Sequence, residues 1–137
     1  MDKKKKLVEA ILDEDFDKTF NILQEIYNND NGSTYVEFLI IFIMDNPDID
    51  YGMPGPIVHF IEKYPIDYYI SLLLKTIEQK PNDTLLWMLN RITNVSDGSK
   101  KEKYIEIFKY TIERKDIDEM TRDAAIRFYK YQSSSNV

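Results

Sequence analysis

The sequence predicts an all-α fold of about eight short helices. Apolar residues recur every three or four positions along most of the chain, which is the period of a helix with one buried face. Pro54, Pro56, Pro65 and Pro81 divide the middle of the chain, and proline begins a helix well but continues one badly. The β-branched run from Phe38 to Met44 would suit a strand, but it has no partner strand elsewhere in the chain.

Turn-forming and helix-capping residues indicate where the expected helices begin and end. The polar cluster from Asn28 to Gly32 ends the second helix by turn chemistry. Capping boxes that open at Thr34 and Ser99 begin the third and seventh helices, and Asn82 or Asp83 caps the sixth. The expected helices span about residues 4–14, 16–28, 34–45, 56–64, 66–80, 83–94, 99–112 and 119–131, with 46–53 as the longest loop.

Short connections between these helices predict four consecutive antiparallel hairpins. The simplest packing of such hairpins is a small stack resembling HEAT or other α-solenoid repeats, and an irregular helical bundle is the alternative. We expect one all-helical domain over residues 1–132 and a disordered tail over residues 133–137. The helix over residues 34–45 is apolar on every side, so it is expected to be the most buried element.

Composition restricts the location and the chemistry of the protein. The 137 residues include no cysteine, which excludes disulfides, thiolate zinc sites and cysteine nucleophiles and fits a reducing cytoplasm. The basic start breaks into acids after a few apolar residues, so export is not expected. The longest apolar run, Phe38 to Met44, is far shorter than the roughly 20 residues that span a bilayer, so no membrane association is expected.

Acidic residues are concentrated in the first third of the chain. Residues 7–50 contain eleven acids and a single base, Lys18. Such a surface repels nucleic acid and accelerates the approach of a basic partner. A surface that only keeps the protein in solution is the alternative interpretation. No nucleic-acid binding is expected in either case.

No set of residues in the sequence indicates catalysis. His59 and Glu62 are three apart on one helix, but a single histidine and a carboxylate are two ligands short of a zinc site. A structural role is favoured, in which Glu62 pairs with Arg91. Glycine-rich phosphate loops and serine or cysteine nucleophile motifs do not occur. We therefore expect no catalytic residue, no metal and no cofactor.

Two groups of side chains have both a structural and a binding interpretation. Asn90 and Asn94 form a polar row on the sixth helix, beside Trp87 and Arg91, and asparagine is unusual inside a helix. The row either ties this helix to its neighbours or lies on a binding face. The ten tyrosines, several of which lie near loops, are explained equally by core edges and by an interface.

The stretch from Gly52 to Asn94 carries a resemblance to a known family. Its two segments, GMPGPIVHFIEK and PNDTLLWMLNRITN, are similar to an all-helical family of immunity proteins from bacterial polymorphic toxin and contact-dependent growth inhibition systems. The resemblance covers about a third of the chain. The matching residues are Pro54, Gly55, Pro56, His59, Phe60, Glu62, Pro81, Trp87, Leu89, Asn90, Arg91 and Asn94.

The resemblance implies a small cytoplasmic protein that binds the toxic C-terminal domain of a cognate effector and blocks it by occlusion. Many such toxin domains are nucleases with basic faces, which an acidic surface can meet. The shared residues Pro54, Pro56, His59, Glu62, Trp87, Asn90, Arg91 and Asn94 are then expected to determine the fold. The hypothesised partner contacts are Asp13, Asp17, Asp45, Asp48, Asp50, Tyr51 and Tyr68.

Two other function classes remain as alternatives. A helical-repeat scaffold or adaptor would bind a peptide or protein partner in a groove. An enzyme would have to use His59 and Glu62, and this alternative has the least support.

Overall fold

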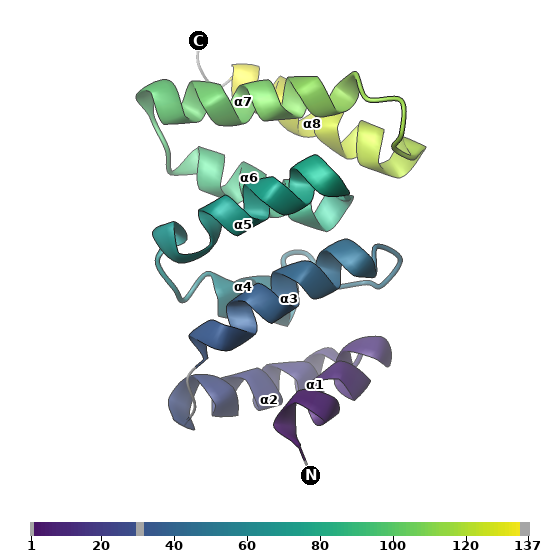
Figure 1. Ribbon diagram of the computed structural model, residues 1–137, viewed down its shortest axis with the longest axis vertical. Helices are drawn as coiled ribbons and strands as arrows, with labels where there is room; N and C mark the ends of the chain where they lie inside the picture. The colour runs from purple at the N-terminus through teal and green to yellow at the C-terminus, as the bar shows by residue number, and fades with distance from the viewer. Residues whose placement is uncertain (1, 30–31, 135–137) are drawn as a thin grey trace. The chain divides into compact units, whose positions relative to one another are not determined.

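A computed structural model describes residues 2–29 and 32–134 (Figure 1). Over these residues the structure contains eight α-helices and no strand, which confirms the predicted all-α class. The helices are α1 (Lys3–Leu12), α2 (Phe16–Asn29), α3 (Ser33–Asp45), α4 (Gly55–Ile61), α5 (Ile66–Gln79), α6 (Asp83–Asn94), α7 (Gly98–Ile112) and α8 (Glu119–Ser134).

The chain divides into two compact units, and each is described here by itself. Unit 1 spans Met1–Ile70 and unit 2 spans Ser71–Val137, so the boundary falls within α5. The single domain over residues 1–132 and the solenoid stack of the whole chain stay predictions. Among the described residues, no helix has both the length and the apolar character that crossing a bilayer requires.

In unit 1, α2 packs on α1 and on α4, and α3 packs on α4. Apolar side chains spaced three or four apart fill the interior between these helices, as a helix with one buried face requires. The core residues of this unit include Leu7, Ala10, Ile11, Leu23, Ile26, Val36, Leu39, Ile40, Ile43, Ile57, Val58, Phe60 and Ile61.

In unit 2, α6, α7 and α8 pack against one another in all three combinations. The Phe128 ring lies between two aromatic neighbours, with its centroid 5.8 Å from that of Trp87 and 5.9 Å from that of Phe108. The Asn82 side chain accepts a hydrogen bond from the Leu85 backbone N–H at 2.9 Å, so it caps α6 as predicted. The core of this unit includes Leu73, Ile77, Leu85, Leu86, Leu89, Phe108, Ala124, Ala125 and Phe128.

The two predicted capping boxes are wrong. Helix α3 begins at Ser33 with Gly32 as its N-cap, and α7 begins at Gly98 after Asp97. Thr34 and Ser99 are therefore the second residues of their helices. A capping box requires its Ser or Thr at the N-cap, a position that Gly32 and Asp97 occupy here.

Helix α8 and helix α3 also differ from expectation. Ser133 and Ser134, expected in a disordered tail, are the last residues of α8. The rest of that tail, residues 135–137, lies outside the described residues, as do residues 30–31 of the predicted turn. Helix α3 is not the most buried element, because Ile41 is exposed while α6 buries more of its side chains.

Candidate functional site

The turn after α1 and the loop after α3 are joined by one hydrogen bond. The Glu14 Oε2 atom accepts from the backbone N–H of Asp50 at 2.8 Å, across 36 residues of sequence. This bond brings together two acidic segments of unit 1, residues 13–17 and 48–50, in which every acidic side chain is exposed. We call their six acids the acidic corner: Asp13, Glu14, Asp15, Asp17, Asp48 and Asp50.

The turn between α1 and α2 is built by its own acids. Glu14 has a φ of 54°, a left-handed conformation that reverses the chain so that α2 begins at Phe16. The Asp15 carboxylate then accepts from the backbone N–H of Lys18 at 3.1 Å and satisfies a donor in the first turn of α2. These acids therefore determine the conformation of the turn and also give it negative charge.

The loop between α3 and α4 is fixed by Tyr51. Its ring is buried, with 3% of the residue exposed, and its hydroxyl donates to the Asn46 carbonyl at 2.7 Å. Burial raises the pKa of Tyr51 far above its ordinary value of 10.0. The expectation that Tyr51 is a surface contact is therefore corrected, because this side chain anchors the loop that carries Asp48 and Asp50.

Gly52 allows the same loop to turn back on itself. Its φ of 90° is unfavourable for other residues, and a Cβ added there would lie 2.6 Å from the Gly55 Cα. The Asp50 Oδ1 atom accepts from the Gly52 N–H at 2.9 Å. The turn leaves the next side chain, Met53, 75% exposed.

The structure places the other predicted contact residues in three positions. Asp13 and Asp17 lie in the first acidic segment, and Asp48 and Asp50 lie in the second. Asp45 is exposed at the end of α3, where the second loop begins. Tyr68 is near the start of α5 and is 65% exposed. Its ring stacks on that of Tyr64, with centroids 6.5 Å apart.

Exposed apolar side chains beside the acidic corner escaped the sequence analysis. Phe16 and Phe20 continue the apolar helical period of α2, but these residues are 39% and 51% exposed. Thr19 is buried in their place. The sequence feature that could have predicted this exposure is the width of the apolar stripe on α2, which is wider than the face of the helix that the core buries. Phe16 borders a small hollow lined also by Ile11, Glu14, Thr19, Asp50, Tyr51, Pro56 and Ile57.

Tyrosines form a second feature of the same unit. The ring of Tyr64 makes edge contacts with Tyr27 and Phe60, with centroids 5.8 and 5.5 Å away. The Lys63 ammonium lies 4.4 Å from the centroid of the Tyr27 ring and donates to the Gln24 side-chain Oε1 atom at 3.0 Å. A tyrosine of this cluster thus already holds a cation on its face.

The motif residues of α4 are placed by the helix start. Pro54 precedes α4 as its N-cap, and Pro56 occupies the first turn, where the missing N–H costs nothing. His59 Nδ1 and Glu62 Oε1 are 3.9 Å apart, and the His59 side chain is mostly exposed. Within residues 2–29 and 32–134, no three histidine, cysteine or acidic side chains are grouped so that they could hold a metal ion.

The polar row of α6 is connected to α8. The buried Gln132 side-chain amide donates to Asn90 Oδ1 at 2.8 Å and to Asn94 Oδ1 at 2.7 Å. The sequence analysis missed Gln132, because glutamine near a chain end carries no pattern that predicts burial. Trp87 lies on the same helix and packs on Phe128 of α8. Glu62 and Arg91 belong to different units, so the expected pair between them stays a prediction.

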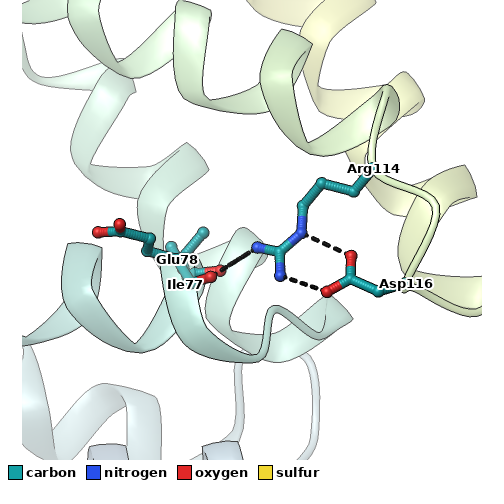
Figure 2. Close-up of polar contacts among 4 residues, drawn as sticks. All are labelled: Ile77, Glu78, Arg114 and Asp116. Atoms are coloured by element: carbon teal, nitrogen blue, oxygen red, sulfur yellow. Dashed lines mark hydrogen bonds and ion pairs between the residues drawn. The ribbon is translucent and has the colours of Figure 1, made fainter.

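The sequence analysis also did not single out Arg114, whose side chain hydrogen-bonds to carbonyls in the last turn of α5 (Figure 2). Its Nη1 atom donates to the carbonyls of Ile77 at 3.2 Å and Glu78 at 2.7 Å. Its Nε and Nη2 atoms donate to the two Asp116 oxygens at 2.9 and 2.8 Å. These hydrogen bonds lower the pKa of Asp116 and raise the pKa of Arg114. Arg114 therefore acts as a structural clamp for carbonyls at the helix end.

Comparisons of the chain with protein-family models, curated proteins and solved structures find no match. The resemblance carried by the α4 and α6 motifs thus stays a prediction.

Proposed function

We propose that this protein is an immunity protein that binds the toxin domain of a bacterial polymorphic toxin or contact-dependent inhibition system. It neutralises that domain by covering its active or substrate-binding site, and it acts in the cytoplasm of the cell that makes the toxin. The observation that carries the proposal is the acidic corner, in which one hydrogen bond joins two exposed acidic segments beside exposed aromatic side chains.

The geometry of the acidic corner supports protein binding more than simple charging of the surface. An acidic surface that only maintains solubility needs no fixed shape. Here Tyr51 anchors the loop and Glu14 holds it to the turn after α1. Binding costs less conformational entropy when the contact surface is ordered beforehand. A basic partner such as a nuclease domain would bind more tightly because of both the negative charge and the fixed shape of this surface.

The proposal is tested by growth and by co-purification. Cells that express the toxin domain encoded beside this gene should stop growing, and co-expression of this protein should restore growth. The two proteins should then co-purify as a stable complex. A chain with Asp13, Asp17, Asp48 and Asp50 changed to asparagine is expected to protect less well. A folded, helical protein that neither protects cells nor binds the toxin domain would contradict the proposal.

A groove in unit 2 favours a second candidate function, that of a scaffold or adaptor that binds a peptide. The groove lies between α5 and α7, with Leu74, Ile77 and Ile107 among its apolar lining. Its charged lining includes Lys103 and Glu106. An apolar groove of this kind can receive one face of an amphipathic helix. Binding of a peptide that Ile107→Glu abolishes, without toxin binding by the intact chain, would favour this alternative.

A further inference from the structure

Several apolar side chains of the described residues lie exposed beside the acidic corner: Leu12, Phe16, Phe20 and Met53. Phe16 and Phe20 are four residues apart on α2, so they lie on the same side of the helix. The end of the Phe16 ring lies 3.8 Å from the position of a Cβ on Gly52, so the loop that presents Met53 runs along this ring. We call Phe16, Phe20 and Met53 the apolar anchor. Their exposed fractions are 39%, 51% and 75%.

The fold of unit 1 does not account for the apolar side chains of Phe20 and Met53. The interior beneath α2 is filled by Leu23 and Ile26 together with Thr19, all of which are buried. Phe20 and Met53 expose more than half of their surface, so polar side chains at these positions would cost the core little. Isolated exposed apolar residues are common, but a group on one surface is typical of a binding site.

The charges around the apolar anchor identify the kind of partner. Residues 12–20 and 48–53 contain six acids and one base, Lys18. An apolar centre with a charged rim is the usual anatomy of a protein interface. A second copy of this chain would bring the same acids into contact and be repelled. Charge complementarity therefore selects a partner with an apolar side chain that is surrounded by lysine and arginine.

We infer that the apolar anchor is the energetic centre of the interface, and that the partner covers it with an apolar side chain ringed by basic residues. The inference rests on the proposed function, since the partner is the cognate toxin domain. Burial of the anchor slows dissociation, because aromatic and methionine side chains dominate the core of an interface. The acidic corner mainly accelerates association.

The test compares two double variants in binding kinetics with the purified toxin domain. Phe20→Ala with Met53→Ala removes most of the anchor. Tyr131→Ala with Met120→Ala removes side chains of similar type from unit 2, which are 54% and 65% exposed. The anchor variant should dissociate about tenfold faster or more, with an association rate within about twofold of the original chain. The control should keep both rates.

The outcomes separate this inference from the proposed function. An original chain that binds the toxin domain, with unchanged dissociation in the anchor variant, overturns the inference and leaves the proposed function standing. Faster dissociation in the unit 2 control alone also overturns it, because the contact then lies in the other unit. An original chain that shows no binding overturns both. Circular dichroism and thermal unfolding of each variant verify that the compared chains are folded.

Discussion

Glu14 is the residue on which the shape of the acidic corner depends. Its carboxylate accepts the Asp50 N–H although its own backbone lies in the left-handed region. Such a conformation is unusual outside glycine and asparagine, and it persists where surrounding contacts hold it. The side chain thus links a turn that the sequence places near residue 15 to a loop that follows α3.

We predict that Glu14→Ala lowers the free energy of unfolding by about 0.5–1.5 kcal/mol, the usual net value of one hydrogen bond. Glu14→Gln keeps an acceptor oxygen and should lose less. Asp13→Ala, at the neighbouring exposed position, is the control and should stay within about 0.5 kcal/mol of the original chain. Urea unfolding followed by circular dichroism measures all three. Equal stability of Glu14→Ala and the original chain would show that this bond contributes nothing.

At this scale the sequence was informative about charge and weak about burial. It predicted that acids gather before residue 50, and four of the expected contacts do lie in the acidic corner. It misplaced Tyr51, because tyrosine is compatible with both core and surface. It also could not predict that Glu14 meets Asp50, since this contact depends on how two hairpins pack and not on any local spacing.

At the scale of elements, the loop between α3 and α4 is shaped by its glycines. Gly52 and Gly55 both have positive φ, but only at Gly52 does an added Cβ meet other backbone. A Cβ on Gly55 would meet nothing within 4 Å. An alanine at either position would have a strained positive φ, but only an alanine at Gly52 would also clash with other backbone atoms. Comparing the two substitutions therefore separates the cost of the clash from the cost of the strain.

We predict that Gly55→Ala destabilises the protein by about 1–2 kcal/mol, the cost of placing alanine in a left-handed conformation. Gly52→Ala should cost more, because the loop must also move to relieve the contact with Gly55. It should in addition weaken toxin binding, since the displaced loop carries Asp48, Asp50 and Met53. Chemical unfolding and binding kinetics of both variants test this ordering. Equal losses of stability in the two variants would contradict the expected clash between an alanine Cβ at position 52 and the backbone of Gly55.

The start of α8 gives unit 2 a pH dependence. Hydrogen bonding by Thr121, most strongly through its side chain and then through its backbone N–H, lowers the pKa of Asp118 below its ordinary value of 3.8. The backbone N–H of Thr121 donates to the Asp118 carboxylate at 2.8 Å. A carboxyl whose pKa is lower in the folded state stabilises fully above its unfolded pKa. This contribution is lost as the pH falls through the folded pKa.

We therefore predict that stability falls between about pH 5 and pH 2, partly through Asp118. At pH 7, Asp118→Asn should unfold at about the same urea concentration as the original chain, because asparagine caps a helix about as well as aspartate. Its loss of stability on acidification should be smaller, since asparagine does not titrate. Urea midpoints measured across this pH range test the difference. An identical pH profile for the two chains would exclude Asp118 as a contributor.

The helices themselves were largely predictable, because apolar period and proline spacing determine them locally. Over residues 2–29 and 32–134, the number and order of the eight helices agree with the sequence analysis, and most helix ends differ by only a few residues. The misplaced starts of α3 and α7 arose because several residues near each start are able to cap a helix. Packing of α2 was less predictable, since its apolar stripe is wider than its buried face.

At the scale of the whole molecule, charge and apolar surface occur together in unit 1. The chain has a formal net charge of −6, but residues 7–50, with eleven acids and one base, are net −10, and the remaining residues are net +4. Unit 2 is instead distinguished by internal links such as Gln132 with the α6 asparagines and Arg114 with the end of α5. This contrast is the reason for assigning partner binding to unit 1 and structural roles to the α6 motif.

The most direct test of this account is the association rate with the cognate toxin domain at several salt concentrations. One variant changes Asp13, Asp17, Asp48 and Asp50 to asparagine. Its control changes Asp97, Glu102, Glu106 and Asp123 of unit 2 to the matching amides, so both lose four negative charges. The first variant should associate about tenfold more slowly at low salt, with a flattened salt dependence, while the control stays near the original chain. Equal effects in both variants, or none, would contradict binding through the acidic corner.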